Sequence, residues 1–229
     1  MNYKVLIFDA DGTLFDFEQA EQQAFYAMLK DFDILPSNDL FESYLIENKK
    51  AWSDLEQGNI TQEELKTRRF LGFIRVASLE GNAKAYAASY MHHLSEQSIL
   101  YPDALNIIEK LSKDYTLTIL TNGLREVQHQ RIRYSALRPY IKDVVISDEL
   151  GIAKPNPKII EYALKNINHL EKENVMIIGD SLTSDIQGGL NASITTVWYN
   201  PNRIINKTTI KPTHEIHSLD ELFMLLEKK

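Results

Sequence analysis

Five short runs of apolar, mostly β-branched residues recur along the chain, and they constrain the fold more than any other feature. Each run is bounded by polar residues or turn formers, which marks it as a separate strand. Short, continuously apolar runs are typical of strands in a parallel sheet that is covered on both faces. The runs are Lys4–Phe8, Thr116–Leu120, Asp143–Ile146, Asn174–Ile178 and Ile194–Tyr199.

Helical patterns lie between most of these runs. Apolar residues recur with helical spacing at Leu105, Ile108 and Leu111, and again within 159–167. The alternation of strands and helices predicts an α/β core with a doubly wound, Rossmann-like parallel sheet. Ser218 and Glu221 form a capping-box pattern, so we expect a C-terminal helix to close the core.

An insertion separates the first two strands. They lie about a hundred residues apart, although a crossover with one helix needs only about 10–12. Residues 17–97 are rich in helix formers and include no convincing strand. Thr61 and Glu64 mark a helix start after a Gly58-Asn59 turn. We therefore expect an all-helical cap domain over 17–97 and an α/β core that comprises 1–16 and 98–229.

Charge and composition exclude several classes of protein. The 229 residues carry a formal net charge of −7 and include no cysteine. An acidic chain lacks the basic face of a nucleic-acid binder, and the absence of cysteine excludes disulfides and cysteine metal sites. No apolar stretch approaches the roughly 18 residues of a membrane-spanning helix, and the N-terminus becomes acidic too early for a signal peptide. We expect a soluble, cytoplasmic protein whose partner is neither a membrane nor a nucleic-acid polymer, and no protein partner is implied.

Reactive side chains follow the predicted strands. The segments are Asp9-Ala10-Asp11-Gly12-Thr13, Thr121-Asn122-Gly123, Lys154-Pro155-Asn156-Pro157, and Gly179-Asp180-Ser181 with Asp185 after it. In open α/β sheets, ligands bind outside the carboxyl ends of the strands, so these segments are expected to converge. Without a cation, Asp9, Asp11 and Asp180 would repel one another and take up protons. Magnesium prefers oxygen ligands and is commonly held by one or two carboxylates, so we predict Mg²⁺ as the cofactor.

These segments, in this order, resemble the motifs of the haloacid dehalogenase-like hydrolases. The matching parts are DADGT at 9–13, TN at 121–122, Lys154 and GDSLTSD at 179–185. FDADGTLFDF, GNITQEEL, TNG and SDELGIAKPNPKI are similar to the corresponding segments of YjjG/YfnB-like pyrimidine 5′-nucleotidases. The resemblance implies a magnesium-dependent phosphatase that works through an aspartyl-phosphate.

The resemblance also implies a role for each motif residue. Asp9 would be the nucleophile, and Asp11 the general acid and base. Asp9, Asp180 and the backbone carbonyl of Asp11 would bind the metal. Asp185, in the outer shell, would orient Lys154 or a metal-bound water. Thr121 and Lys154 would act in catalysis. Phosphate would be bound by Gly12, Thr121, Asn122 and Lys154.

The cap is expected to close over the site and to supply specificity. Candidate substrate-binding residues in it combine flat surfaces with polar or cationic groups, and they are Phe17, Asn48, Lys49, Trp52 and Arg69. Phe15, close to Phe17, offers a further flat surface. A cap of about eighty residues suits a small phosphorylated metabolite, and base stacking contributes about 1–3 kcal/mol, which favours a nucleotide over a bare sugar phosphate. The preference for pyrimidine nucleoside monophosphates, including deoxy and modified ones, is implied by the resemblance alone.

Other functions remain open at this point. Asp11 speaks against dehalogenation, because replacing a carbon–halogen bond does not call for an acid beside the leaving group. A sugar-phosphate phosphatase, or a phosphomutase that passes the phosphoryl group to a second sugar hydroxyl, would use the same nucleophile. A non-catalytic nucleotide-binding protein is the alternative from another class, since a fold alone does not fix function.

Overall fold

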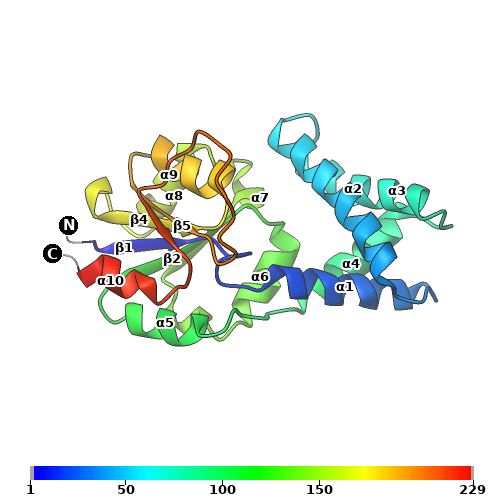
Figure 1. Cartoon of the computed structure of the whole chain (residues 1–229), viewed down its shortest axis with the longest axis horizontal. Coiled ribbons are helices and arrows are strands. Elements are labelled where there is room, and N and C mark those ends of the chain that lie inside the picture. The colour runs from blue at the N-terminus through cyan, green and yellow to red at the C-terminus, as the bar shows by residue number, and fades with distance from the viewer. Residues whose placement is uncertain (1–2, 228–229) are drawn as a thin grey trace. The chain divides into compact units, whose positions relative to one another are not determined.

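The computed structural model describes residues 3–227. The chain divides into two compact units, a core unit and a helical unit, whose elements are labelled in Figure 1. The core unit comprises Met1–Phe17, Ser98–Gln128 and Ile132–Lys229. The helical unit comprises Glu18–Gln97 and His129–Arg131. Within residues 3–227, no helix is both long enough and apolar enough to cross a membrane.

A parallel sheet forms the centre of the core unit, with six strands among the described residues in the order β3-β2-β1-β4-β5-β6. The strands are β1 (Val5–Phe8), β2 (Thr116–Thr121), β3 (Asp143–Ile146), β4 (Val175–Gly179), β5 (Thr195–Tyr199) and β6 (His214–Ile216). The strand order reverses between β1 and β4, because β2 and β3 lie on one side of β1 while the later strands lie on the other. Ligands bind at such a switch point in doubly wound sheets.

Both faces of the sheet are covered, which explains the continuously apolar strands. Leu6 and Phe8 of β1 pack into one hydrophobic cluster, and Val5 and Ile7 pack into another. The first cluster includes residues of α5 (Ala104–Leu111) and α10 (Glu221–Glu227), whereas the second includes residues of α8 (Pro157–Asn166). Figure 1 shows α5 and α10 on one side of the sheet, and α8 with α9 (Gln187–Asn191) on the other. The predicted doubly wound core is confirmed.

Shorter elements complete the core unit. They are α6 (Arg125–Arg133), of which residues 129–131 belong to the helical unit, α7 (Ser147–Leu150), the 3₁₀ turns η1 (Arg138–Tyr140) and η2 (Lys172–Asn174), and the π-helical turn η3 (Leu182–Ile186). Before α10, Glu221 Oε1 accepts hydrogen bonds from the backbone N–H groups of His217 and Ser218. This contact confirms the helix start that was predicted from Ser218 and Glu221.

Two details of the core unit differ from the sequence-based expectation. β6 was not predicted, because His214 and Glu215 leave it without an apolar run. The predicted buried stripe of α5 is also displaced. Leu105 is 38% exposed, whereas Ile107 and Ile108 are buried, because helix α5 turns a neighbouring position toward the sheet.

The helical unit consists of α1 (Phe17–Asp31), α2 (Asn38–Glu56), α3 (Gln62–Val76) and α4 (Ala83–Ser95). Thr61 caps α3 as predicted, since its Oγ1 accepts from the Glu64 N–H at 3.2 Å while Glu64 Oε2 accepts from the Thr61 N–H at 2.8 Å. The core of the unit is aromatic, and the Tyr44 ring stacks with those of Phe25 and Phe70 at centroid distances of 4.7 and 5.4 Å. The predicted all-helical insertion is therefore confirmed.

Polar side chains are also buried in the helical unit. Asn48 Nδ2 donates to Glu21 Oε1 at 2.8 Å, and Arg69 Nη1 donates to Asn48 Oδ1 at 3.3 Å. The Arg69 guanidinium also lies 4.9 Å from the ring centre of Tyr90. Asn48 thus links the buried carboxyl group of Glu21 to the buried guanidinium of Arg69, and buried polar groups that are hydrogen-bonded cost less than unpaired ones.

Candidate active site

Asp9 lies directly after β1, at the switch point of the sheet. Its side chain is nearly enclosed, with 8% of the residue exposed, and its N–H donates to the carbonyl oxygen of Ile178 in β4 at 2.9 Å. The residue is therefore held between the two strands at which the strand order reverses.

The turn after Asp9 depends on a glycine. Gly12 has a φ of +86°, and a Cβ atom there would lie 2.7 Å from Asp180 Oδ2. A side chain would be strained and would also displace the Asp180 carboxylate. Asp180 is held from other directions too, because Thr13 Oγ1 donates to its Oδ1 at 3.5 Å and Trp198 Nε1 donates to its backbone carbonyl at 2.8 Å.

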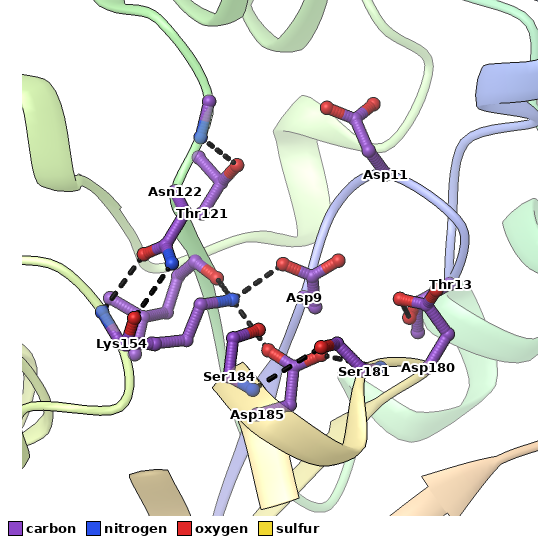
Figure 2. Close-up of polar contacts among 12 residues, drawn as sticks. Asp9, Asp11, Thr13, Thr121, Asn122, Lys154, Asp180, Ser181, Ser184 and Asp185 are labelled. Atoms are coloured by element: carbon purple, nitrogen blue, oxygen red, sulfur yellow. Dashed lines mark hydrogen bonds and ion pairs between the residues drawn. The ribbon is translucent and has the colours of Figure 1, made fainter. Parts of the chain in front are cut away.

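Lys154 lies at the centre of a buried polar cluster (Figure 2). Its Nζ donates to Asp9 Oδ1 at 2.5 Å, to Asp185 Oδ1 at 2.6 Å and to the carbonyl oxygen of Leu120 at 2.7 Å. Only 4% of the residue is exposed. These contacts satisfy all three ammonium protons and fix the cation beside Asp9.

The Asn122 side chain fixes the backbone of Lys154. Its Oδ1 accepts from the Lys154 N–H at 2.9 Å, and its Nδ2 donates to the Lys154 carbonyl at 2.9 Å. The amide of Asn122 thus contacts both polar groups of one backbone residue, a role that was not predicted for this side chain.

We expect Lys154→Met to lower the free energy of unfolding of the core unit by about 3–5 kcal/mol, because it leaves two buried carboxylates without their cation. Urea unfolding followed by Trp198 fluorescence, in a Trp52→Phe background, measures this unit. Exposed Lys158 provides the matched control as Lys158→Met. Equal stabilities of the two variants would show that the cluster contributes nothing to folding.

The cluster carries more negative charge than Lys154 balances. Burial raises the pKa of Asp9 well above its ordinary value, although the Lys154 ammonium opposes this. Burial alone would lower the pKa of Lys154, but the charges of Asp185 and Asp9 outweigh it and raise that pKa, so Lys154 stays protonated. Asp180 reaches solvent on one side, yet its partial loss of hydration and the charge of Asp185 raise its pKa to about 7. Additional positive charge would therefore be stabilised here.

A hard cation fits this set of donors. One oxygen each of Asp9, Asp180 and Asp185 lies within 4.8 Å of the others. Asp185 is already engaged, since its Oδ1 accepts from Lys154 and its Oδ2 accepts from the Ser181 N–H at 3.0 Å. Asp9 and Asp180 are therefore better placed to bind a cation than Asp185, and carboxylate oxygens suit Mg²⁺.

Thr121 ends β2 with a hydroxyl that accepts two hydrogen bonds. Its Oγ1 accepts from the Gly123 N–H at 3.0 Å and from Gln128 Nε2 at 3.2 Å. Gln128 Nε2 also donates to Asp11 Oδ2. In Figure 2, the Asp11 carboxylate points away from the cluster around Lys154. Sequence reasoning missed Gln128, because a single glutamine in a polar helix matches no motif.

The predicted residues of the core unit meet at the carboxyl edge of the sheet, except that Asp11 turns aside (Figure 2). The residues that meet are Asp9, Gly12, Thr121, Asn122, Lys154, Asp180 and Asp185. Phe15 does not offer the expected flat surface. It is fully buried in the core unit, because the turn after β1 carries it back to the Ala10 carbonyl, to which its N–H donates at 2.9 Å.

The predicted substrate-binding residues of the cap differ in exposure. Asn48 and Arg69 are buried, Phe17 and Trp52 are half-buried, and Lys49 is exposed. Within residues 3–227, Nε and Nη2 of Arg69 have no hydrogen-bond partner, so this buried guanidinium retains unused donors.

Comparison with known proteins identifies the family. The family model described as haloacid dehalogenase-like hydrolase matches residues 6–199. The chain belongs to this family. The family membership that was predicted from the four motifs is thus confirmed. Each motif of this hydrolase begins at or after the last residue of a strand of the observed sheet.

Relatives of this hydrolase match it over nearly the whole length. Pyrimidine 5′-nucleotidase PynA of Streptococcus pneumoniae is 37% identical, over 100% of this chain and 97% of the relative. Pyrimidine 5′-nucleotidase YjjG of Escherichia coli is 32% identical, over 100% of both chains. The crystal structure of the HAD-hydrolase YfnB of Bacillus subtilis, bound to magnesium, has a TM-score of 0.94 and 34% identity, and the match covers 99% of this chain and 100% of that one. The predicted enzyme class is confirmed, and the chain is a phosphoric monoester hydrolase.

Proposed function

We propose that this hydrolase is a magnesium-dependent 5′-nucleotidase that releases phosphate from pyrimidine nucleoside monophosphates through an aspartyl-phosphate on Asp9. The observation that carries the mechanism is the placement of the Asp9 carboxylate, buried at the switch point, 2.5 Å from the Lys154 ammonium and beside Asp180. A nucleophile, a fixed cation and a second carboxylate are thereby held at one sheet edge.

In the first step, a carboxylate oxygen of Asp9 forms a bond to phosphorus while the bond from phosphorus to the 5′ oxygen of the nucleoside breaks. Asp11 gives its proton to that leaving oxygen, so the nucleoside departs as an alcohol. Lys154 stabilises the negative charge of the transferred phosphoryl group.

In the second step, Asp11 takes a proton from water, and the water oxygen attacks phosphorus. The bond between phosphorus and Asp9 breaks, inorganic phosphate leaves, and both aspartates return to their starting states. Splitting one difficult displacement into two steps is the advantage of a covalent intermediate.

Thr121 is suited to bind the phosphoryl group through its hydroxyl proton. A hydroxyl has one donor and two acceptor positions. Gly123 and Gln128 both donate to Thr121 Oγ1, at 3.0 and 3.2 Å. The remaining O–H is therefore directed to another acceptor, and a phosphoryl oxygen is a suitable one. The Asn122 N–H and Gly12 are the further phosphate-binding groups that we propose.

Asp9 and Asp180, with the backbone carbonyl of Asp11, are the residues that would hold Mg²⁺. When bound, the ion would neutralise these carboxylates and the substrate phosphate. Asp185 then acts on Lys154, whose Nζ lies 2.6 Å from its Oδ1, and Lys154 in turn contacts Asp9.

The substrate class is supported by the two nucleotidases, which resemble this chain over its full length. We propose that Trp52, half-buried on α2, stacks on the pyrimidine base, and that Phe17, Lys49, Asn48 and Arg69 contribute to substrate binding. A small phosphorylated metabolite is the expected partner.

A substrate panel tests this proposal. We expect kcat/KM for UMP, dUMP and dTMP to exceed that for AMP, GMP and sugar phosphates. Trp52→Ala should lower the pyrimidine values by about 5- to 150-fold, because base stacking contributes about 1–3 kcal/mol. Hydrolysis of p-nitrophenyl phosphate, which lacks the base, should change much less.

Trp52→Phe is the control, since it retains an aromatic face and should keep the pyrimidine preference. Equal losses with the nucleotides and with p-nitrophenyl phosphate would show that Trp52 only supports the helical unit. Higher kcat/KM for sugar phosphates would contradict the nucleotidase assignment while leaving the phosphatase mechanism intact.

A further inference from the structure

Gln128 on α6 is a buried amide whose contact with Asp11 has no role in the mechanism described above. Only 1% of the residue is exposed. Its Nε2 donates to Asp11 Oδ2 and, at 3.2 Å, to Thr121 Oγ1. An amide nitrogen carries two N–H protons, so these two contacts use both of them.

The orientation of the amide follows from its partners. An ionised carboxylate only accepts hydrogen bonds, so the NH₂ group and not the oxygen must face Asp11 when that residue is ionised. The contact to Thr121 anchors the same nitrogen to the end of β2. Gly123 makes room for it, since a Cβ atom there would lie 2.3 Å from Gln128 Nε2.

The oxygen of the Gln128 amide contributes no hydrogen bond within the described residues. Gln128 Oε1 is buried without a hydrogen-bond partner in the described part of the chain. A buried acceptor in that state costs stability, so an apolar side chain of similar length would serve packing better. The NH₂ group is therefore the part of the residue that its site requires.

We propose that Gln128 is a positioning residue that orients the Asp11 carboxylate for proton transfer and ties its position to the phosphate-binding Thr121. This inference rests on the proposed function, in which Asp11 is the general acid and base. In Figure 2, the Asp11 carboxylate points away from Asp9, and its Oδ2 accepts a hydrogen bond from Gln128 Nε2, which lies outside the Lys154 cluster. Gln128 makes this contact from helix α6.

If Gln128 acts through Asp11, the effect of its loss on kcat/KM should depend on the leaving group. A nucleoside leaves as an alkoxide unless it is protonated, whereas p-nitrophenolate is a stable anion and needs no acid. The parameter kcat/KM reports the first chemical step, in which the leaving group departs. Loss of Gln128 should therefore lower kcat/KM for a nucleotide far more than for p-nitrophenyl phosphate.

The test is Gln128→Met, which keeps a flexible side chain of similar length and removes both donors. Full acid–base assistance contributes about 10²–10⁴-fold, and we expect the variant to lose about 10- to 100-fold in kcat/KM for the best nucleoside monophosphate of the panel. The loss for p-nitrophenyl phosphate should stay within about threefold. Gln130→Met, at an exposed position of the same helix, should change neither value.

A double-mutant cycle separates this role from a structural one. In an Asp11→Asn background, Gln128 has no general acid left to orient. Adding Gln128→Met should then lower kcat/KM for the nucleotide by no more than it lowers kcat/KM for p-nitrophenyl phosphate. If thermal unfolding shows that Gln128→Met is not folded, Gln128→Asn takes its place, since it keeps the amide but is too short to reach Asp11. The same leaving-group-dependent loss is expected for it.

Equal losses with both esters, no loss with either, or multiplicative losses in the Asp11→Asn background would overturn the role of Gln128. A wild-type protein that releases phosphate from neither ester would instead overturn the proposed function. The two failures are therefore distinguishable.

Discussion

Asp9→Asn is expected to abolish phosphate release and to prevent formation of a phosphoenzyme. An uncharged amide is a poor nucleophile, and loss of a covalent nucleophile lowers kcat by a factor on the order of 10⁴ or more. The measurement is turnover with the best nucleotide, together with acid trapping of labelled phosphate on the protein and location of the label by mass spectrometry.

The same variant should remain folded. The amide oxygen that the substitution introduces can still accept a hydrogen bond from Lys154, which keeps its contacts to Asp185 at 2.6 Å and to the Leu120 carbonyl at 2.7 Å. If the unfolding transition is unchanged, the loss of phosphate release is due to the missing nucleophile and not to misfolding. Asp220→Asn, at an exposed position, is the matched control and should be fully active. Label trapped on a residue other than Asp9 would contradict the mechanism.

The sheet could be predicted because its strands are buried on both faces. Val5 and Ile7 contact one cluster while Leu6 and Phe8 contact the other, so every position of β1 has to be apolar and the run is conspicuous in the sequence. In β6, His214 and Glu215 are not buried, so these positions need not be apolar and the strand has no apolar run in the sequence. Burial on two faces leaves a stronger sequence signal than burial on one.

The main site residues could be predicted because parallel strands bring their carboxyl ends to one edge. Asp9, Lys154 and Asp185 follow three different strands, and their contacts at 2.5 and 2.6 Å agree with that expectation. Rules of this kind place backbones and not side chains. They therefore missed the Asn122 side chain, which contacts the backbone of Lys154, and the contact between Gln128 and Asp11.

The sequence also does not reveal which polar side chains of the helical unit are buried. Asn48 and Arg69 are candidate substrate-binding residues because they carry a polar and a cationic group, yet both are buried and are hydrogen-bonded to each other in the core of that unit. Polar residues at helical spacing give the same sequence pattern whether they face a ligand or a buried partner.

Removal of magnesium is expected to abolish turnover, and its return is expected to raise the thermal stability of the protein. The ion would bind carboxylates that come together only in the folded chain, so it stabilises the native state by about 2.7 kcal/mol when its concentration is 100 times Kd. The measurements are phosphate release after exhaustive chelation and the unfolding temperature during a magnesium titration. Sodium chloride of equal ionic strength is the control, because salt also screens the repulsion between carboxylates.

Asp180→Asn distinguishes a metal site from a general effect of charge. Asp9, Asp180 and Asp185 each have an oxygen within 4.8 Å of the others, so without metal they repel one another. Replacing Asp180 by asparagine removes one of these charges, and the metal-free variant should therefore be at least as stable as the metal-free wild type. It should nevertheless gain little stability from magnesium, because a carboxylate ligand is lost. The order of the two unfolding temperatures is thus expected to reverse between chelator and saturating magnesium. A variant that gains as much stability from magnesium as the wild type, or full turnover after complete metal removal, would show that Asp180 does not hold a required cation.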